Sequence, residues 1–499
     1  MRLRSPAISI AFLIPVFTYT QVPRALVDHQ PSISTTKQSG TFGGHDISYT
    51  AIVEEHILKG PDSIPNAFLV TIAYVRDGIT DKSRRPVAFA FNGGPGASSS
   101  PLHFSGIGPR VGGRGGAVNN PHSILDATDL VFIDPVGTGF SRPYSTEIGK
   151  QFYWNEKGDA ASVTEVIGRW LKKYGRESSP RYMIGESYGT VRIGAILRNC
   201  PNLKFDGVVL VSAVGGNGGA DMTYLRGVPS MAVSAWYHEL IPRLGRTVDQ
   251  VWGEAVAFVR TDYSAALAQG AALPETEKNK IAEKLSSLVG LPAAFIEEKN
   301  IRLTANDWLM NVLKDKGLRV SNQDTRETGP LVLTAEQAAN MSPASGLGGT
   351  HPFGQPGSVG QVPAIVPGSD SVIATLSSKL PTTALESYLK NDLQFKTPES
   401  YRSLNLDINP FWRSGGNIMN MQPADDVAAR MRTDPNMRMF WIQGYFDLNT
   451  PAYSALYSYE QAGIPADRKT GIMSPGPHTA FATDESKAVL SAALRKWIH

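Results

Sequence analysis

The sequence predicts an α/β fold with a central, mostly parallel sheet and a largely helical insertion. Five short runs are continuously apolar and end in glycine- or proline-rich turns, as buried parallel strands do, because both of their faces are covered. Helical stretches alternate with these runs, which favours parallel pairing. From about residue 216 to residue 409 the alternation stops, and alanine- and leucine-rich helical segments replace it. The five runs are Val87–Phe91, Leu130–Ile133, Tyr182–Ile184, Val208–Val211 and Met439–Ile442.

Two of the expected helices belong to the sheet and three to the insertion. They are Asp159–Lys173 and Thr190–Leu197, then Val248–Arg260, Glu275–Leu288 and Asn306–Lys314. The segment Met341–Asp370 is rich in glycine, proline and serine, which indicates an ordered loop or a mobile flap. We expect the aromatic residues of the insertion, such as Trp252 and Trp308, to form its own core.

This pattern divides the chain into four parts. They are a signal segment (1–24), a first core part (25–215), a helical insertion that could cap a site (216–415) and a second core part (416–499). The signal segment is predicted from the basic Met1–Arg4 and the apolar run Ala7–Tyr19 that follows it. That run falls short of the about 20 residues that span a bilayer, so no stable membrane anchor is expected. On this interpretation the protein is secreted or periplasmic; a buried N-terminal helix or strand is the alternative.

Composition excludes several classes of protein. The 499 residues carry 48 Lys and Arg against 45 Asp and Glu, a net charge of +3, with 19% charged and 41% hydrophobic residues. This balance is unlike that of disordered or collagen-like chains, and it lacks the concentrated positive charge that binds nucleic acid. The single cysteine, Cys200, permits no intrachain disulfide and no cysteine-based metal site. We expect it to be a buried, inert thiol.

A serine motif follows one of the predicted strands. Residues Gly185–Gly189 read Gly-Glu-Ser-Tyr-Gly, which matches G-x-S-x-G directly between an apolar strand and a helix. Such a turn displays the serine in a strained conformation, and glycines on either side avoid clashes. An ordinary strand-to-helix turn is the alternative, but the context favours Ser187 as a nucleophile. Arg192, just behind it, could tune the site or pair with an acid in the insertion, and we favour the structural pair.

Candidates for an acid and a base follow Ser187 in the chain. Asp447 closes the apolar run that ends in Gly-Tyr-Phe-Asp, and His478 lies in a turn near the C-terminus. In such a triad the acid orients the imidazole, which takes the serine proton. Each residue alone could belong to a turn or a surface loop, but their order and their places at strand ends favour a triad. The other histidines after Ser187 are His238 in an expected helix, His351 in the flap and His499 at the terminus.

A second glycine-rich turn, Asn92–Gly96, also follows a strand. Its backbone N–H groups can point at a developing oxyanion. It contains no lysine, so it is not a phosphate-binding loop, and no G-x-G-x-x-G opens a helix. No H-E-x-x-H motif occurs, because His238-Glu239 is followed by Leu-Ile-Pro. The sequence therefore predicts neither a metal nor a cofactor.

Taken together, these blocks resemble the serine carboxypeptidase family of α/β-hydrolases. The similarity spans most of residues 85–215 and 435–480, and Pro229–His238 in the insertion. It implies an α/β-hydrolase fold with a helical cap, peptide or protein C-termini as substrates, and activity at acid pH. The blocks that recur in the family's order are NGGPGASS (92–99), DLVFIDPVGTGFS (129–141), GESYG (185–189), GYFDLNTP (444–451) and the GPH turn (476–478).

The resemblance also implies a role for each matching residue. Ser187 would be the nucleophile, Asp447 the acid and His478 the base. The backbone N–H groups of Gly94 and Tyr188 would form the oxyanion hole.

Three further residues, Asn92, Gly93 and Glu186, would bind the free carboxylate of the substrate. Glu186 must then be protonated, because two anions in contact repel each other. Two departures from the family pattern weaken this carboxylate-binding site. Ala90 stands where the family usually has a tryptophan, and Gly106 stands where it commonly has a second glutamate.

We therefore expect a serine-type carboxypeptidase that hydrolyses C-terminal peptide bonds through an acyl-enzyme. One alternative is an esterase or acyltransferase with the same triad, which Ala90 and Gly106 motivate. Another is a catalytically silent binding protein on a hydrolase scaffold, against which the intact triad argues. Ala97, in place of the family's usual cysteine, indicates a bacterial-type member. The oligomeric state and the preferred substrate side chains are left open.

Overall fold

The computed structural model describes residues 30–216, 219–331, 383–412 and 421–498. The expected signal segment (1–24), the segment Met341–Asp370, His351 and His499 lie outside these residues. No described helix is long and apolar enough to cross a membrane.

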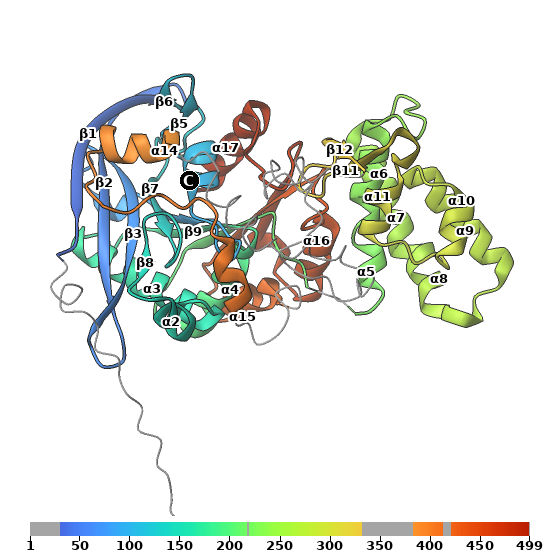
Figure 1. Ribbon diagram of the computed structural model, residues 1–499, viewed down its shortest axis with the longest axis horizontal. Helices are drawn as coiled ribbons and strands as arrows, with labels where there is room; N and C mark the ends of the chain where they lie inside the picture. The colour runs from blue at the N-terminus through green and yellow to red at the C-terminus, as the bar shows by residue number, and fades with distance from the viewer. Residues whose placement is uncertain (1–29, 217–218, 332–382, 413–420, 499) are drawn as a thin grey trace, which may run out of the picture.

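A ten-stranded sheet forms the centre of the molecule (Figure 1). Its strands lie in the order β1-β2-β3-β7-β4-β9-β10-β13-β14, and the short β8 pairs with β3. Pairing is antiparallel from β1 to β7 and parallel from β7 to β14. The five apolar runs are neighbours in the parallel part, so the predicted fold class is confirmed. The strands are β1 (Ile33–Phe42), β2 (His45–Lys59), β3 (Pro65–Arg76), β4 (Val87–Phe91), β7 (Asp129–Asp134), β8 (Arg142–Pro143), β9 (Arg181–Glu186), β10 (Gly207–Val211), β13 (Arg438–Gly444) and β14 (Lys469–Ser474).

The register of the parallel strands brings their carboxyl ends to one edge. Phe91 pairs with Gly185, Val211 with Glu186, and Gly444 with Ser474. The chain also reverses direction across the sheet at β4, which lies between the later strands β7 and β9. In open α/β sheets, ligands bind beyond the carboxyl ends at such a reversal.

The three N-terminal strands β1, β2 and β3 were not among the predicted elements. β3 is buried at every position from Asn66 to Tyr74, so its apolar run was overlooked. In β1 and the first half of β2 the signal is an alternation, since Ile47, Tyr49 and Ala51 are buried and the residues between them are not. That pattern marks strands with one covered face, whereas the prediction rested on continuously apolar runs. A hairpin, β5 (Arg110–Gly113) with β6 (Gly116–Asn119), was also missed.

Helices cover both faces of the sheet because neighbouring residues of each strand point to opposite sides. Phe89 and Phe91 of β4 enter one core, whereas Ala88 and Ala90 enter the other. The first core lies under α3 (Glu156–Lys173), α4 (Tyr188–Asn199), α15 (Pro423–Thr433) and α16 (Ala452–Gln461). The second lies under α14 (Thr383–Ser387) and α17 (Asp484–Ile498).

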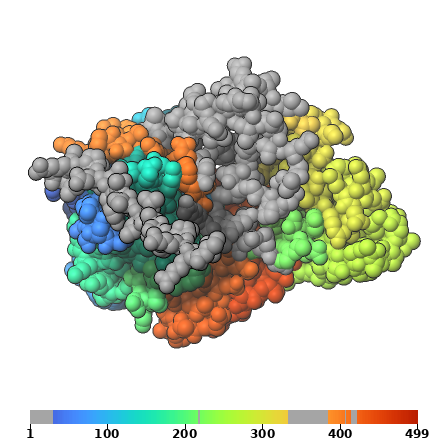
Figure 2. Space-filling model, turned by 60° about the horizontal axis from the view of Figure 1, so that its bottom comes forward, coloured from blue at the N-terminus to red at the C-terminus, as the bar shows by residue number. Residues whose placement is uncertain are grey.

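The described part of the insertion is a helical lobe at the end of the molecule opposite β1 (Figures 1 and 2). Trp308 and Trp252 lie in its core, as expected, and Phe446 and Leu448 of the sheet's loops join them. Within the range assigned to the insertion, residues 388–401 instead pack against the sheet. The helices of the lobe are α5 (Met222–Leu225), α6 (Val228–Tyr237), α7 (Val248–Phe258), α8 (Ser264–Gln269), α9 (Glu275–Val289), α10 (Ala293–Glu298) and α11 (Ala305–Asn311), followed by the hairpin β11 (Leu318–Val320) and β12 (Thr328–Pro330).

Candidate active site

Ser187 occupies a sharp turn between β9 and α4. Its φ of 59° and ψ of −127° are unusual for a residue with a side chain, so the turn is strained. Its N–H donates to Val211 O at 2.9 Å, which ties the turn to the end of β10. The flanking glycines leave no room for side chains: a Cβ on Gly185 would lie 2.5 Å from Gly189 O, and one on Gly189 would lie 2.8 Å from Phe91 O.

Asp447 and His478 meet beyond the ends of β13 and β14. His478 Nδ1 is 2.8 Å from Asp447 Oδ2, and Asp447 is fully buried. The other carboxylate oxygen accepts the backbone N–H groups of Asn449 and Thr450, both at 2.8 Å. Burial lowers the pKa of His478, but the charges of Asp447 and Glu186 and the hydrogen bond to Asp447 outweigh burial and raise it.

Three polar residues that the sequence analysis did not single out hold this pair. The Thr450 hydroxyl lies 2.7 Å from Asp447 Oδ2 and 3.0 Å from Ser212 O, whereas Ser212 Oγ donates to His478 O at 2.5 Å. Asn449 Nδ2 lies 3.3 Å from His478 Nε2, the imidazole nitrogen turned away from the acid. Ser212 directly follows Val211, the residue bonded to Ser187, so the serine and histidine loops are neighbours.

The turn after β4 lies against the residue that follows Ser187. A Cβ on Gly93 would lie 2.3 Å from the backbone nitrogen of Tyr188, so only glycine permits this approach. Gly94 has a φ of 98°, a conformation that glycine adopts without strain. The turn that contains Gly94 thus lies against Tyr188 through its neighbour Gly93.

Asn92 and Glu186 form a buried pair beside this turn. Asn92 Nδ2 donates to Glu186 Oε1 at 2.7 Å, while Asn92 Oδ1 accepts the N–H of Leu102 at 3.0 Å. Glu186 Oε2 is buried and has no hydrogen-bond partner in the described part of the chain. Burial raises the pKa of Glu186 to about 7; His478 and the bond from Asn92 oppose this effect, and Asp447 adds to it.

Arg192 pairs with an acid, as expected, but the prediction that this acid lies in the insertion was wrong. Arg192 Nε is 2.6 Å from Asp159 Oδ2 of α3, within the sheet's own core and not in the insertion. Its Nη1 donates to Asn92 O at 2.6 Å, so this buried pair also supports the turn after β4. No motif in the chain indicates this contact, because α3 and α4 become neighbours only through packing on the sheet.

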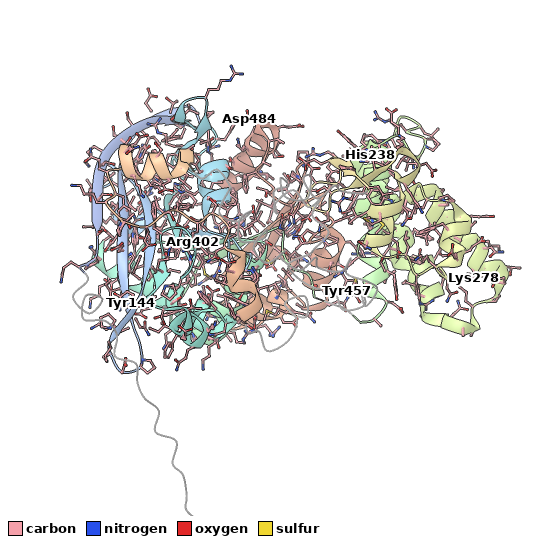
Figure 3. The ribbon with its side chains drawn as sticks, in the orientation of Figure 1. Tyr144, His238, Lys278, Arg402, Tyr457 and Asp484 are labelled. Carbon is pink, nitrogen blue, oxygen red and sulfur yellow. The ribbon has the colours of Figure 1, made fainter. Side chains whose placement is uncertain are left out.

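A strap, which we define as residues 400–409, holds the glycine-rich turns from outside (Figure 3 labels its Arg402). It makes backbone and side-chain bonds to the turn after β4 and to the DPVGTG turn after β7. The bonds are Ser98 N to Ser403 O (2.9 Å), Asn405 N to Gly96 O (2.8 Å), Asn409 Nδ2 to Pro95 O (2.8 Å) and Gly139 N to Arg402 O (2.8 Å). The second turn is also fixed to the first, because Asp134 Oδ1 accepts both the N–H and the hydroxyl of Ser99.

Other residues that the sequence analysis discussed lie away from this centre or are enclosed. His238 caps α6, and its Nε2 lies 2.7 Å from Thr325 O. Cys200 ends α4 and is half-buried, where full burial was expected, because the helix end reaches the surface. A Cβ on Gly106 would lie 3.1 Å from Pro101 O, so a side chain there would need its neighbours to shift by a few tenths of an ångström. The described residues contain no group of three or more acidic, histidine or cysteine side chains that could hold a metal.

Comparison with known proteins finds similarity to one family. Residues 74–287 match the family model of serine carboxypeptidases. Over 122 residues the chain is 34% identical to a serine carboxypeptidase-like protein of Arabidopsis thaliana, covering 23% of this chain and 24% of that one. Over 172 residues it is 27% identical to serine carboxypeptidase 1 of Hordeum vulgare, covering 30% and 32%. The matches thus span about a quarter to a third of these relatives.

A solved structure extends the similarity of fold to the rest of the chain. A prohormone-processing carboxypeptidase of Saccharomyces cerevisiae matches with a TM-score of 0.50 over 90% of both chains, at 12% identity. The sheet order and this similarity define an α/β-hydrolase fold. Within the chain, residues 74–287 are similar to the serine carboxypeptidase family. These three similar proteins are plant and fungal, so they do not support the expectation of a bacterial-type member.

Proposed function

We propose that the protein is a serine-type carboxypeptidase that removes C-terminal residues from peptides through an acyl-enzyme on Ser187. The observation that carries the proposal is the hydrogen bond between His478 Nδ1 and the buried Asp447, next to the strained Ser187 turn. A buried acid held by two backbone N–H groups keeps the imidazole in the tautomer whose Nε2 can accept a proton.

In the proposed reaction, His478 Nε2 takes the proton of Ser187 Oγ as that oxygen bonds to the carbonyl carbon. The negative charge that develops on the carbonyl oxygen is stabilised by the backbone N–H groups of Gly94 and Tyr188. The C–N bond then breaks, and His478 returns the proton to the leaving amine. A water molecule, deprotonated by the same imidazole, hydrolyses the acyl-enzyme and restores Ser187.

The free carboxylate of the substrate would be held by Asn92, Gly93 and Glu186. Glu186 can donate a hydrogen bond to a carboxylate only while it is protonated, which a pKa of about 7 permits at acid pH. A proton on Glu186 also removes a negative charge that raises the pKa of His478, which favours the neutral base. The first effect supports a preference for acid pH, and the second lessens the protonation of the base that would oppose it.

The test compares a blocked dipeptide that has a free carboxylate with the same dipeptide as an amide, at about pH 4.5 and 7.5. We expect cleavage of the free acid alone, faster at the lower pH, and loss of cleavage in Ser187→Ala. Cys200→Ala is the control and should keep full activity, because the thiol lies at the far end of α4. Undiminished cleavage by Ser187→Ala would disprove the proposal.

An esterase or acyltransferase is the second candidate, because Gly106 stands where the family commonly has a second acid. A Cβ at this position would lie 3.1 Å from Pro101 O and 3.4 Å from Phe481 Cβ, so this chain has packed the position around a residue without a side chain. Turnover of a neutral ester in preference to the free-acid peptide, with no preference for acid pH, would favour this function. A silent binding protein would not be labelled at Ser187 by a fluorophosphonate.

We also propose, from the basic and apolar N-terminus alone, that the protein is exported to the periplasm or the medium. The intact mass of the natively expressed protein tests this proposal, since removal of the signal would place the new N-terminus near residues 20–26. A full-length mass would contradict it.

A further inference from the structure

The loop between β11 and β12 of the insertion contacts both the acid loop and the base loop. We call residues 321–326 the bridging loop. It forms three backbone hydrogen bonds, of which two reach the loop of Asp447 and one reaches the candidate base itself. The bonds are Leu448 N to Asn322 O (3.0 Å), Thr325 N to Phe446 O (3.0 Å) and His478 N to Gln323 O (2.8 Å).

The side chain of Arg326 adds a second connection between the same two loops. Its guanidinium lies 4.8 Å from the ring centroid of Phe446, the residue before the acid, and its Nη1 donates to Pro475 O at 3.2 Å. Asp324 holds the guanidinium in this position through two contacts, at 2.8 Å and 2.7 Å. Such a bidentate pair fixes the plane of the group and not merely its charge.

The bridging loop is itself anchored to the helical lobe. The hydroxyl of the buried Thr325 lies 2.5 Å from Ser234 Oγ of α6, and Thr325 O lies 2.7 Å from His238 Nε2 at the end of that helix. The bridging loop is therefore bonded to α6 on one side and to the loops of Asp447 and His478 on the other. The position of α6 determines the position of the bridging loop, which in turn determines the positions of the acid and base loops.

Pairing of β13 with β14 does not by itself set the distance between the acid and the base. The strands end at Gly444 and Ser474, and Asp447 and His478 lie three and four residues beyond these ends. We propose that the insertion positions residues of the catalytic centre, and that its Arg326 is a positioning residue that keeps His478 aligned with Asp447. This inference rests on the proposed function of the triad.

The experiment measures how fast a fluorophosphonate labels Ser187 in the full-length protein, as a function of pH. Wild type is compared with Arg326→Met, Arg326→Lys and the control Arg260→Met. Arg260 also joins the lobe to the sheet domain, through Glu460 of α16 at 2.8 Å, but it does not contact the bridging loop. The thermal unfolding temperature of each protein shows whether it is folded.

We expect Arg326→Met to be labelled about tenfold more slowly, because a misplacement of about 1 Å can cost on the order of 100-fold in rate. The pH midpoint of labelling should also fall, since a looser contact with Asp447 raises the pKa of His478 less; Glu186 is the other charged group that raises this pKa. Arg326→Lys should recover part of the rate, and Arg260→Met should match wild type.

Wild-type rate and midpoint in folded Arg326→Met would overturn the inference and leave the proposed function intact. An equal loss in Arg260→Met would also overturn it, because the effect would then belong to any lobe contact. If wild type itself is not labelled, the proposed function fails and the inference fails with it. Should Arg326→Met not fold, Asp324→Asn takes its place under the same criteria, since it removes the carboxylate that orients the guanidinium.

Discussion

Replacing Glu186 with glutamine should change how the stability of the protein depends on pH. Glu186 is 3% exposed, and one of its oxygens has no partner in the described part of the chain. Burial therefore disfavours the charged carboxylate and raises its pKa from 4.5 to about 7. Glutamine has nearly the same shape, can still accept the bond from Asn92, and never ionises.

The magnitude follows from the difference between the two pKa values. The pKa of Glu186 rises by about 2.5, and at 1.36 kcal/mol for each pKa unit this corresponds to about 3 kcal/mol in the free energy of unfolding. Below about pH 4.5 the carboxyl is protonated in both folded and unfolded chains, and it contributes no pH dependence. Between about pH 4.5 and 7 the unfolded chain loses its proton while the folded chain keeps it, so the wild type loses stability as the pH rises. Above about pH 7 the loss is complete.

The assay is calorimetric unfolding of wild type and Glu186→Gln at about pH 4.5, 6 and 8. For a chain of this length, 3 kcal/mol corresponds to a change of about 3 °C in unfolding temperature. We expect the wild type to fall by about that amount relative to the variant between the lowest and highest pH. Because His478 titrates in both proteins, comparing them isolates most of the contribution of Glu186. Unfolding temperatures that move in parallel would refute the reasoning.

Two further predictions concern residues that support the turn after β4. Arg192→Met leaves the buried carboxylate of Asp159 without its partner and should destabilise the protein by about 3–5 kcal/mol. The control Arg198→Met removes an exposed arginine and should cost about 1 kcal/mol or less. Equal unfolding temperatures of the two variants would contradict this prediction. Gly93→Ala places a Cβ 2.3 Å from Tyr188 N and should slow fluorophosphonate labelling by at least about tenfold, while Gly168→Ala, with open space around it, should label normally. Normal labelling of Gly93→Ala would show that the turn can move away without loss.

The parallel half of the sheet was predictable because each of its strands is covered on both faces. Val87–Phe91, for example, is buried at all five positions and therefore apolar throughout. The edge strand β14 was not predicted, since most of its residues are only half-buried and the sequence shows just a short apolar run. The antiparallel strands β1 and β2 carry polar residues on their exposed faces, which continuous apolar runs cannot reveal.

Some residues of the candidate site could likewise be predicted from local motifs, whereas others could not. Ser187, Asp447 and His478 stand in short motifs whose order along the chain is informative, and the structure places Asp447 and His478 in contact. Thr450 and Ser212 could not be identified, because they meet only after β10 and β13 have paired. The contacts of the bridging loop likewise depend on the position of the lobe, which no motif in the chain specifies.

The strap is synthesised long after the turn that it fixes. Asn409, which bonds to Pro95 O, follows that residue by 314 positions. At about 5–20 residues per second, a ribosome needs about 15 to 60 seconds to add that length of chain. The turn after β4 therefore exists for at least that long before the strap that fixes it is synthesised, and Asp447 and His478 emerge later still. A nascent chain that already displays Ser187 is consequently without the candidate acid and base, so hydrolysis by the proposed triad has to wait until Asp447 and His478 have been added.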